Sequence, residues 1–310
     1  MRIANVDVLI LTALTEEQRV TRSVLSSLSR PAGEHGAIPT RVSLYQFMSR
    51  ESETYLIATA CAHDMGGVAM STFTASLLDV GGIRPTCAIL TGIAASIQPD
   101  LASPGDVAVA SEVYAGDDVK VADGKIAFRP HGYQVDRQLR LAAGHVREDP
   151  ERHTRWRTHC IETLKSIITD LNGCDRTQVV TPAAPLAPML LVGPGAAGPF
   201  LIADREFAVA LREGSPTVGP LHPKLVWAEM EAHGFMRACS EREVPASVIK
   251  GISDCGDSDK SVLERSLGGF YRAAACSNAV VAILEMLRER PPAWAMPAGL
   301  APRSNRDRST

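Results

Sequence analysis

Short apolar runs alternate along the chain with longer segments in which apolar residues recur at helical spacing. The runs are rich in β-branched residues or leucine and are bounded by Gly, Pro or Asp. They predict strands at residues 6–11, 54–60, 86–91, 106–111, 189–192, 225–230 and 247–252. Helices are expected at residues 66–80, 151–171, 231–242 and 270–288. Because strands that are apolar almost throughout are typical of a sheet covered on both faces, we expect an α/β fold with three α/β/α layers around a central mixed, mostly parallel sheet.

The pattern indicates a single domain over residues 1–290. Residues 114–188 separate the fourth and fifth predicted strands, and this stretch is longer than a simple crossover needs, so we treat it as an insertion. The proline-containing, polar stretch at residues 291–310 is expected to be a disordered tail.

Composition narrows the class of protein. With 45% hydrophobic and 22% charged residues, the chain can bury a large core, and its net charge of −3 gives no general attraction to nucleic acid or anionic lipid. No run reaches the roughly 18 uninterrupted apolar residues of a membrane span, and no secretory signal precedes the first strand. We therefore expect a cytoplasmic protein without nucleic-acid or membrane partners. The seven cysteines lack Cys-x-x-Cys spacing, so we expect buried free thiols, no metal site and no cofactor.

Two of the predicted strands end in acidic residues. The strand at 225–230 leads into Glu229, Met230 and Glu231, and the strand at 247–252 leads into Ser253 and Asp254. Ligands of α/β proteins bind at the carboxyl ends of strands, so these residues should share one site. An aspartate there is suited to acid chemistry, although a Ser-Asp pair is also a common helix cap and acids also favour a helix N-terminus.

The order of four short motifs carries a resemblance to a known family. The motifs are Glu16-Glu17, Thr91-Gly92-Ile93-Ala94, Glu229-Met230-Glu231 and Ile252-Ser253-Asp254. From about Val6 to about Leu287 the chain resembles the nucleoside phosphorylase superfamily, in particular its methylthioadenosine/S-adenosylhomocysteine nucleosidases. The long segment 114–188 makes it look more like the related domains of bacterial signalling and defence proteins.

The resemblance implies that the chain releases the free base from a purine nucleoside or nucleotide by hydrolysis. In this family an acid matching Asp254 protonates the purine at N7, and a residue matching Glu231 holds the ribose hydroxyls. The attacking water would be positioned by Glu17, with Glu16 as the fallback, and only one of the two can face the site because successive helical side chains differ by about 100°.

Further residues are expected at the substrate because of the same resemblance. These are Gly92, Ile93, Leu201, Ile202, Glu229, Met230, Lys250 and Ser253. The family's phosphorylases place phosphate ligands at the positions of Leu90 and Ile93, so hydrolysis is favoured over phosphorolysis. Lys250 and Ile93 depart from the usual Arg and Ser of the methylthioadenosine nucleosidases, and Lys lacks the bidentate fork of Arg.

Three alternatives stay open. The chain could be a nucleotide (ATP-type) nucleosidase acting as a defence effector, for which His63, Arg129 and His131 are candidate ligands of the 5′ end. It could be a phosphorolytic purine nucleoside phosphorylase. It could also be a non-catalytic nucleoside- or nucleotide-sensing module. Relatives form dimers or larger assemblies, so a homo-oligomer is expected.

Overall fold

The structure is a computed structural model that describes residues 4–32, 42–50, 53–171, 188–199, 204–256 and 270–288. The strands are β1 (Ala4–Thr12), β2 (Arg30–Pro31), β3 (Ser43–Met48), β4 (Thr54–Cys61), β5 (Ile83–Ser96), β6 (Val107–Ala115), β7 (Val119–Ala122), β8 (Lys125–Phe128), β9 (Gly132–Gln134), β10 (Leu190–Ala197), β11 (Trp227–Glu229) and β12 (Ala246–Asp254). The helices are α1 (Thr15–Leu28), α2 (Gly67–Asp79), α3 (Arg137–Glu148), α4 (Pro150–Leu171), α5 (Arg205–Glu213), α6 (Ala232–Ser240) and α8 (Phe270–Arg288).

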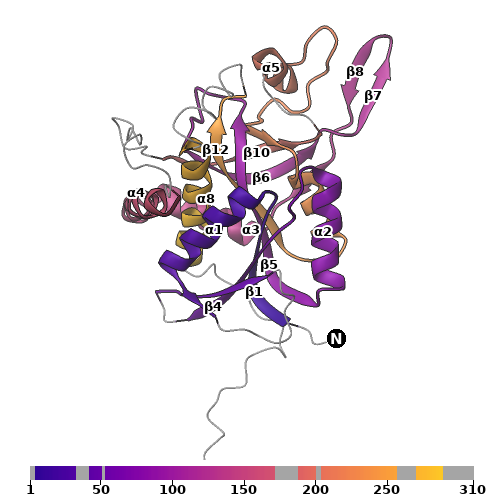
Figure 1. The fold of residues 1–310 in the computed structure, drawn as a ribbon. Helices are drawn as coiled ribbons and strands as arrows, with labels where there is room; N and C mark the ends of the chain where they lie inside the picture. Colours follow the sequence, from indigo (N-terminus) through magenta and orange to yellow (C-terminus); the bar gives the residue numbers. More distant parts are fainter. Residues whose placement is uncertain are drawn as a thin grey trace, which may run out of the picture.

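All seven strands and all four helices expected from the sequence are present, and only the helix at 270–288 keeps both of its expected ends. The sequence pattern did not reveal β3, α3 and α5, nor the β7–β8 hairpin that projects from the body of the protein (Figure 1). The segment 114–188 holds β7, β8, β9, α3 and α4, and β9 pairs with β6, which ties the start of this segment to the main sheet. The expected tail at 291–310 lies outside the described residues.

The main sheet has the strand order β11-β10-β6-β12-β5-β1-β4-β3-β2. An additional pairing of β11 with β5 closes five of these strands into a ring. Pairs such as β1–β5 and β5–β12 are parallel, whereas β6–β12, β3–β4 and β5–β11 are antiparallel. The fold is therefore α/β with a mixed sheet, as expected, but three layers around a mostly parallel sheet are not confirmed, because antiparallel pairs are as frequent as parallel ones and the sheet is partly closed on itself.

Two apolar clusters lie on opposite faces of the sheet. Along β1, Val8 and Ile10 pack with α1, α3, α4 and α8, whereas Leu9 and Leu11 pack with α2 and α6. This alternation follows from the two-residue period of a strand. Figure 1 shows α1, α4 and α8 on one side and α2 on the other.

Helix α8 fills the first of these clusters. It is long and apolar enough to cross a membrane by length and composition alone, but 78% of its apolar window is buried inside the fold, as in the central helix of many globular domains. Six cysteines are free thiols in the described part of the chain, and five of them are buried.

Helices α2 and α6 lie close enough to exclude a side chain at Gly234. A Cβ atom on Gly234 would lie 1.7 Å from the carbonyl oxygen of Gly67. This contact sets the N-terminus of α2 beside the N-terminus of α6, where the Glu229-Met230-Glu231 motif ends.

Candidate active site

The C-terminal parts of β5 and β12 lie side by side in parallel and carry five of the candidates, Gly92, Ile93, Lys250, Ser253 and Asp254. Lys250 is the register partner of Gly92, and Asp254 is the partner of Ala95. Strand β11 approaches β5 from its other edge and pairs there with Ala95 and Ser96. The expectation that separate strand ends converge on one region is confirmed.

Glu17 turns inward at the start of α1 and is buried. Its Oε2 accepts hydrogen bonds from the backbone N–H groups of Ala13 (3.1 Å) and Leu14 (3.0 Å), and its Oε1 accepts one from the N–H of Ile93 (3.0 Å). Since a carboxylate offers about four lone-pair directions, capacity is left for one further donor such as water. Glu16 instead is exposed and forms an ion pair with Arg272 at 3.3 Å.

Gly92 is the residue that makes room for Glu17. Its φ angle is +135°, and a Cβ atom at this position would lie 2.3 Å from Oε1 and 2.6 Å from Cδ of Glu17. Both the backbone conformation and the carboxylate therefore require glycine here.

Lys250 is a fully buried cation among these acids. Its Nζ lies 3.0 Å from Oε2 of Glu229 and 3.8 Å from Oε2 of Glu231. Burial by itself would lower the pKa of Lys250, but the attraction of Glu229, Glu17 and Glu231 outweighs burial and raises that pKa above its ordinary value. The lysine is thus a fixed positive charge against three carboxylates.

Glu229 occupies a structural position within this cluster. Its carboxylate accepts the N–H of Glu231 (3.1 Å) and of Ala232 (2.8 Å), so it satisfies backbone donors at the start of α6. Burial raises the pKa of Glu229 to about 7; Lys250 opposes this shift and Glu231 adds to it.

Glu231 lies at the N-terminal boundary of α6 and is 7% exposed. Its Oε1 accepts the N–H of Gly66 at 3.1 Å, and its other oxygen is the one directed to Lys250. The Glu231 carboxylate is therefore held between Gly66 and Lys250, and a small part of the residue stays exposed.

Asp254 ends β12 with its carboxyl group anchored at both oxygens. Ser253 Oγ lies 2.7 Å from Oδ2, and the N–H of Gly256 donates to Oδ1 at 2.9 Å. The same Ser253 hydroxyl lies 3.4 Å from the carbonyl oxygen of Ala94 on β5. Asp254 is 3% exposed, so its orientation is fixed by the strand end and not by solvent.

The remaining candidates lie in different parts of the structure. Met230 lines a hollow of about 490 Å³ together with His233, a residue that the sequence analysis did not name. Ile93 is half-buried beside Glu17. Leu201 and Ile202 lie outside the described residues. His63 contacts the hydroxyl of Thr15 through Nδ1 at 3.1 Å.

His131 and Arg129 belong to the segment around β8 and β9. The His131 ring packs edge-on against Tyr133 at 4.6 Å, and Tyr133 in turn packs against His233, whose Nδ1 lies 3.1 Å from Asp117. This series of rings leads from β9 to the hollow beside Met230. The described residues hold no group of three or more His, Cys, Asp or Glu that could bind a metal ion.

Known proteins similar to this chain are nucleosidases and a related hydrolase. No protein-family model matches the chain. ATP nucleosidase Cap17 from Escherichia coli is 27% identical over 219 residues, which are 70% of this chain, and the chain spans 38% of that relative's length. Futalosine hydrolase of Helicobacter pylori superposes with a TM-score of 0.60 at 17% identity, covering 91% of this chain and 97% of the other. The methylthioadenosine/S-adenosylhomocysteine nucleosidase of Neisseria meningitidis, in complex with methylthio-immucillin-A, gives a TM-score of 0.56 at 18% identity, covering 91% and 98%. The resemblance to nucleosidases is thereby confirmed, and the chain shares the fold of these solved structures.

Proposed function

We propose that the chain hydrolyses the N-glycosidic bond of a purine nucleoside or nucleotide and releases the free base. One observation carries the proposal. Four buried carboxylates, from Glu17, Glu229, Glu231 and Asp254, are held at adjoining strand ends by backbone N–H groups and by Lys250. Similarity to nucleosidases in sequence and fold supports the same reading.

The roles follow from the chemistry of the bond. Cleavage passes through an oxocarbenium-like sugar, so the base must leave with a proton and the anomeric carbon must meet a nucleophile. Asp254 supplies the proton at purine N7, and Glu17 holds the attacking water. Glu231 accepts hydrogen bonds from the ribose hydroxyls, and these contacts strengthen as positive charge develops on the sugar.

Water is the proposed nucleophile, rather than phosphate. Leu90, at one expected phosphate position, is fully buried in the apolar core and offers no ligand. At the other position, Ile93 has an apolar side chain, and its N–H is already donated to Glu17. A phosphate dianion would therefore meet the carboxylate of Glu17 instead of a cation.

A nucleotide is the second candidate substrate, and the similarity to an ATP nucleosidase favours it. Adenosine, methylthioadenosine, S-adenosylhomocysteine, AMP and ATP should each be incubated with the protein and analysed by chromatography for free adenine. At least one should release adenine.

The Asp254→Asn variant should keep its fold and lose ~10²- to 10⁴-fold in rate, as expected when a general acid is removed. Asp123→Asn is the matched control, because Asp123 lies in the exposed turn of the β7–β8 hairpin, where its φ of 51° suits Asn equally well. Near-normal turnover by Asp254→Asn would remove this residue from the mechanism.

A further inference from the structure

A polar groove of about 590 Å³ runs along the exposed side of α1. Thr15, Gln18, Arg19, Arg22 and Ser23 line it from the helix. These residues recur at three- and four-residue spacing, so they form one face of the helix, while Glu17 points from another face into the site. The groove is thus built on the same helix that positions the proposed water-holding residue.

At Thr15 and His63 the groove is lined by residues close in sequence to those of the proposed active site. His63 lines the groove and contacts Thr15, which is two residues before Glu17. Three residues after His63, the N–H of Gly66 donates to Glu231, the proposed ribose ligand. The segment of Thr15 also carries Glu17, the proposed ligand of the water, and the segment of His63 also carries Gly66, which binds the proposed ribose ligand Glu231.

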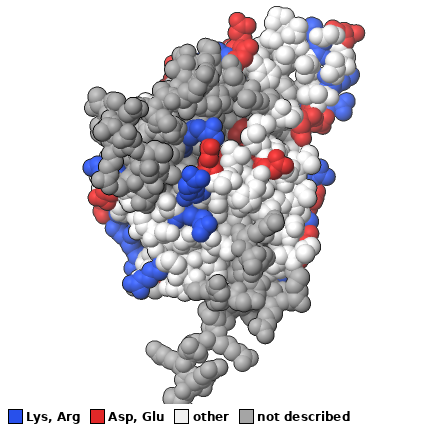
Figure 2. All heavy atoms as spheres, in the orientation of Figure 1, with Lys and Arg blue, Asp and Glu red and all other residues white. Residues whose placement is uncertain are grey.

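The groove carries uncompensated positive charge. Arg19 and Arg22 are exposed, and neither forms an ion pair with any residue that the structure describes. No carboxylate is among the residues that line the groove. Figure 2 shows Lys and Arg side chains near the middle of the face on which Figure 1 shows α1, with Asp or Glu side chains beside the upper ones.

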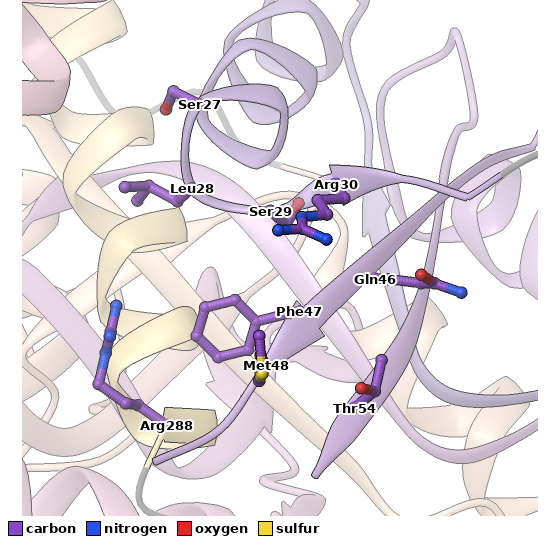
Figure 3. A pocket seen from close by; sticks show the side chains of 9 residues that line it. All are labelled: Ser27, Leu28, Ser29, Arg30, Gln46, Phe47, Met48, Thr54 and Arg288. Atoms are coloured by element: carbon purple, nitrogen blue, oxygen red, sulfur yellow. The ribbon is translucent and has the colours of Figure 1, made fainter. Parts of the chain in front are cut away.

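A second pocket, also lined by arginines, serves for comparison. It lies at the C-terminal end of α1 and is lined by Arg30, Phe47 and Arg288 among others (Figure 3). Its Arg288 is already engaged, with Nε 3.3 Å from Oε2 of Glu285 and its guanidinium 5.5 Å from the centre of the Phe47 ring. Arg30 in this second pocket, like Arg19 and Arg22 in the groove, is exposed and forms no ion pair with the described residues, so what distinguishes the groove is that it carries two such guanidinium groups.

We propose that the groove binds the 5′-phosphate chain of a nucleotide substrate, with Arg19 and Arg22 as its cationic ligands and the hydroxyls of Thr15 and Ser23 as further donors. Arginine forks match phosphate oxygens in two parallel hydrogen bonds, and hydroxyl donors suit the remaining oxygens. This inference rests on the proposed function for its placement of the sugar, and it narrows the substrate class from purine nucleosides to nucleotides.

Turnover gives the first test. Adenine release from adenosine, AMP and ATP is measured for the wild type, Arg19→Gln, Arg22→Gln, the double variant and Arg30→Gln, the last being the matched control in the second pocket. Each substitution in the groove should lower the ratio of kcat/KM for ATP to kcat/KM for adenosine by about 10-fold, the loss expected for a hydrogen bond to a charged group. The ratio for AMP should fall less, and Arg30→Gln should leave all ratios unchanged. An unchanged ATP ratio in the double variant would overturn the inference.

Binding gives a test that does not depend on turnover. Titration calorimetry with inorganic tripolyphosphate should show binding to the wild type and to Arg30→Gln, and at least 10-fold weaker binding to the double variant. If no substrate is turned over but tripolyphosphate binds in this pattern, the proposed function fails and the phosphate groove stands. If adenine is released but tripolyphosphate binds equally to all variants, the groove fails and the proposed function stands.

Stoichiometry separates the phosphate chain of the substrate from a second, independent nucleotide. The Asp254→Asn variant should bind one ATP per chain, with tripolyphosphate in competition. Two ATP molecules per chain, of which only one is displaced by tripolyphosphate, would show a separate nucleotide site and contradict the assignment of the groove to the substrate.

Discussion

Replacing Gly92 by alanine should displace the carboxylate of Glu17 and inactivate the enzyme, although none of the proposed catalytic residues is itself substituted. The added Cβ would lie 2.3 Å from Oε1 of Glu17, far inside van der Waals contact, at a φ of +135°. The backbone conformation costs about 1–3 kcal/mol for a residue other than glycine. Moving the carboxylate away breaks its hydrogen bond from the N–H of Ile93, which costs about 1.5–3 kcal/mol more because the acceptor is charged.

The assay compares adenine release and thermal unfolding for three variants: Gly92→Ala, Gly124→Ala and Glu17→Ala. Loss of a positioned water should lower kcat/KM by about 10²-fold or more. Gly124→Ala is the matched control for backbone strain, because Gly124 also has a positive φ of +71° but no atom within 4 Å of an added Cβ. It should lose stability and keep its activity.

A double-variant cycle identifies the cause of the loss. In a Glu17→Ala background the clash is gone and the water ligand is already missing, so Gly92→Ala should reduce activity little further. Fully additive losses would show that Gly92 does not act through Glu17. Near-normal activity of Gly92→Ala alone would refute the placement of Glu17 at the nucleophile.

Two further variants test the sugar ligand and the buried charges. Glu231→Gln should lower kcat more than it raises KM, because the contacts of Glu231 to the ribose strengthen in the transition state. The wild type should discriminate against a 2′-deoxy substrate, and Glu231→Ala should discriminate much less. Equal discrimination by the two proteins would show that Glu231 does not bind the sugar. For Glu229 the folded pKa of about 7 exceeds the ordinary value of 4.5, so the unfolded chain loses its proton first as pH rises. The free energy of unfolding should therefore fall between about pH 4.5 and pH 7, by up to about 3 kcal/mol from this group, and the fall should be smaller in Glu229→Gln when both are followed by denaturant titration. An identical pH profile in the two proteins would show that Glu229 ionises normally.

The sequence alone located the acidic strand ends, because apolar runs that stop at acids are visible in one dimension. The family resemblance favoured Glu17 over Glu16; in the structure Glu17 is buried, whereas Glu16 forms a surface ion pair with Arg272. The catalytic roles of these residues remain proposals.

Other features depend on contacts between distant segments, which no local pattern encodes. The ring closure of the sheet requires only two register pairs between β11 and β5, and β11 itself is three residues long. The ion pair of Lys250 with Glu229 joins residues of two different strands, and the clash that forbids a side chain at Gly92 arises from a helix seventy-five positions earlier in the chain. The groove on α1 was likewise not predicted, because Arg19, Arg22 and His63 come together only in the folded chain.

The most direct test of the proposed function follows the oxygen atom that replaces the base. The protein is incubated with the preferred substrate in ¹⁸O-labelled water containing phosphate, and both products are analysed by mass spectrometry. Hydrolysis predicts free adenine and an equal amount of sugar carrying one ¹⁸O atom at the anomeric carbon, with no sugar 1-phosphate. A sugar 1-phosphate as the main product would contradict hydrolysis, and the absence of adenine from every nucleoside and nucleotide tried would contradict glycosidic cleavage itself.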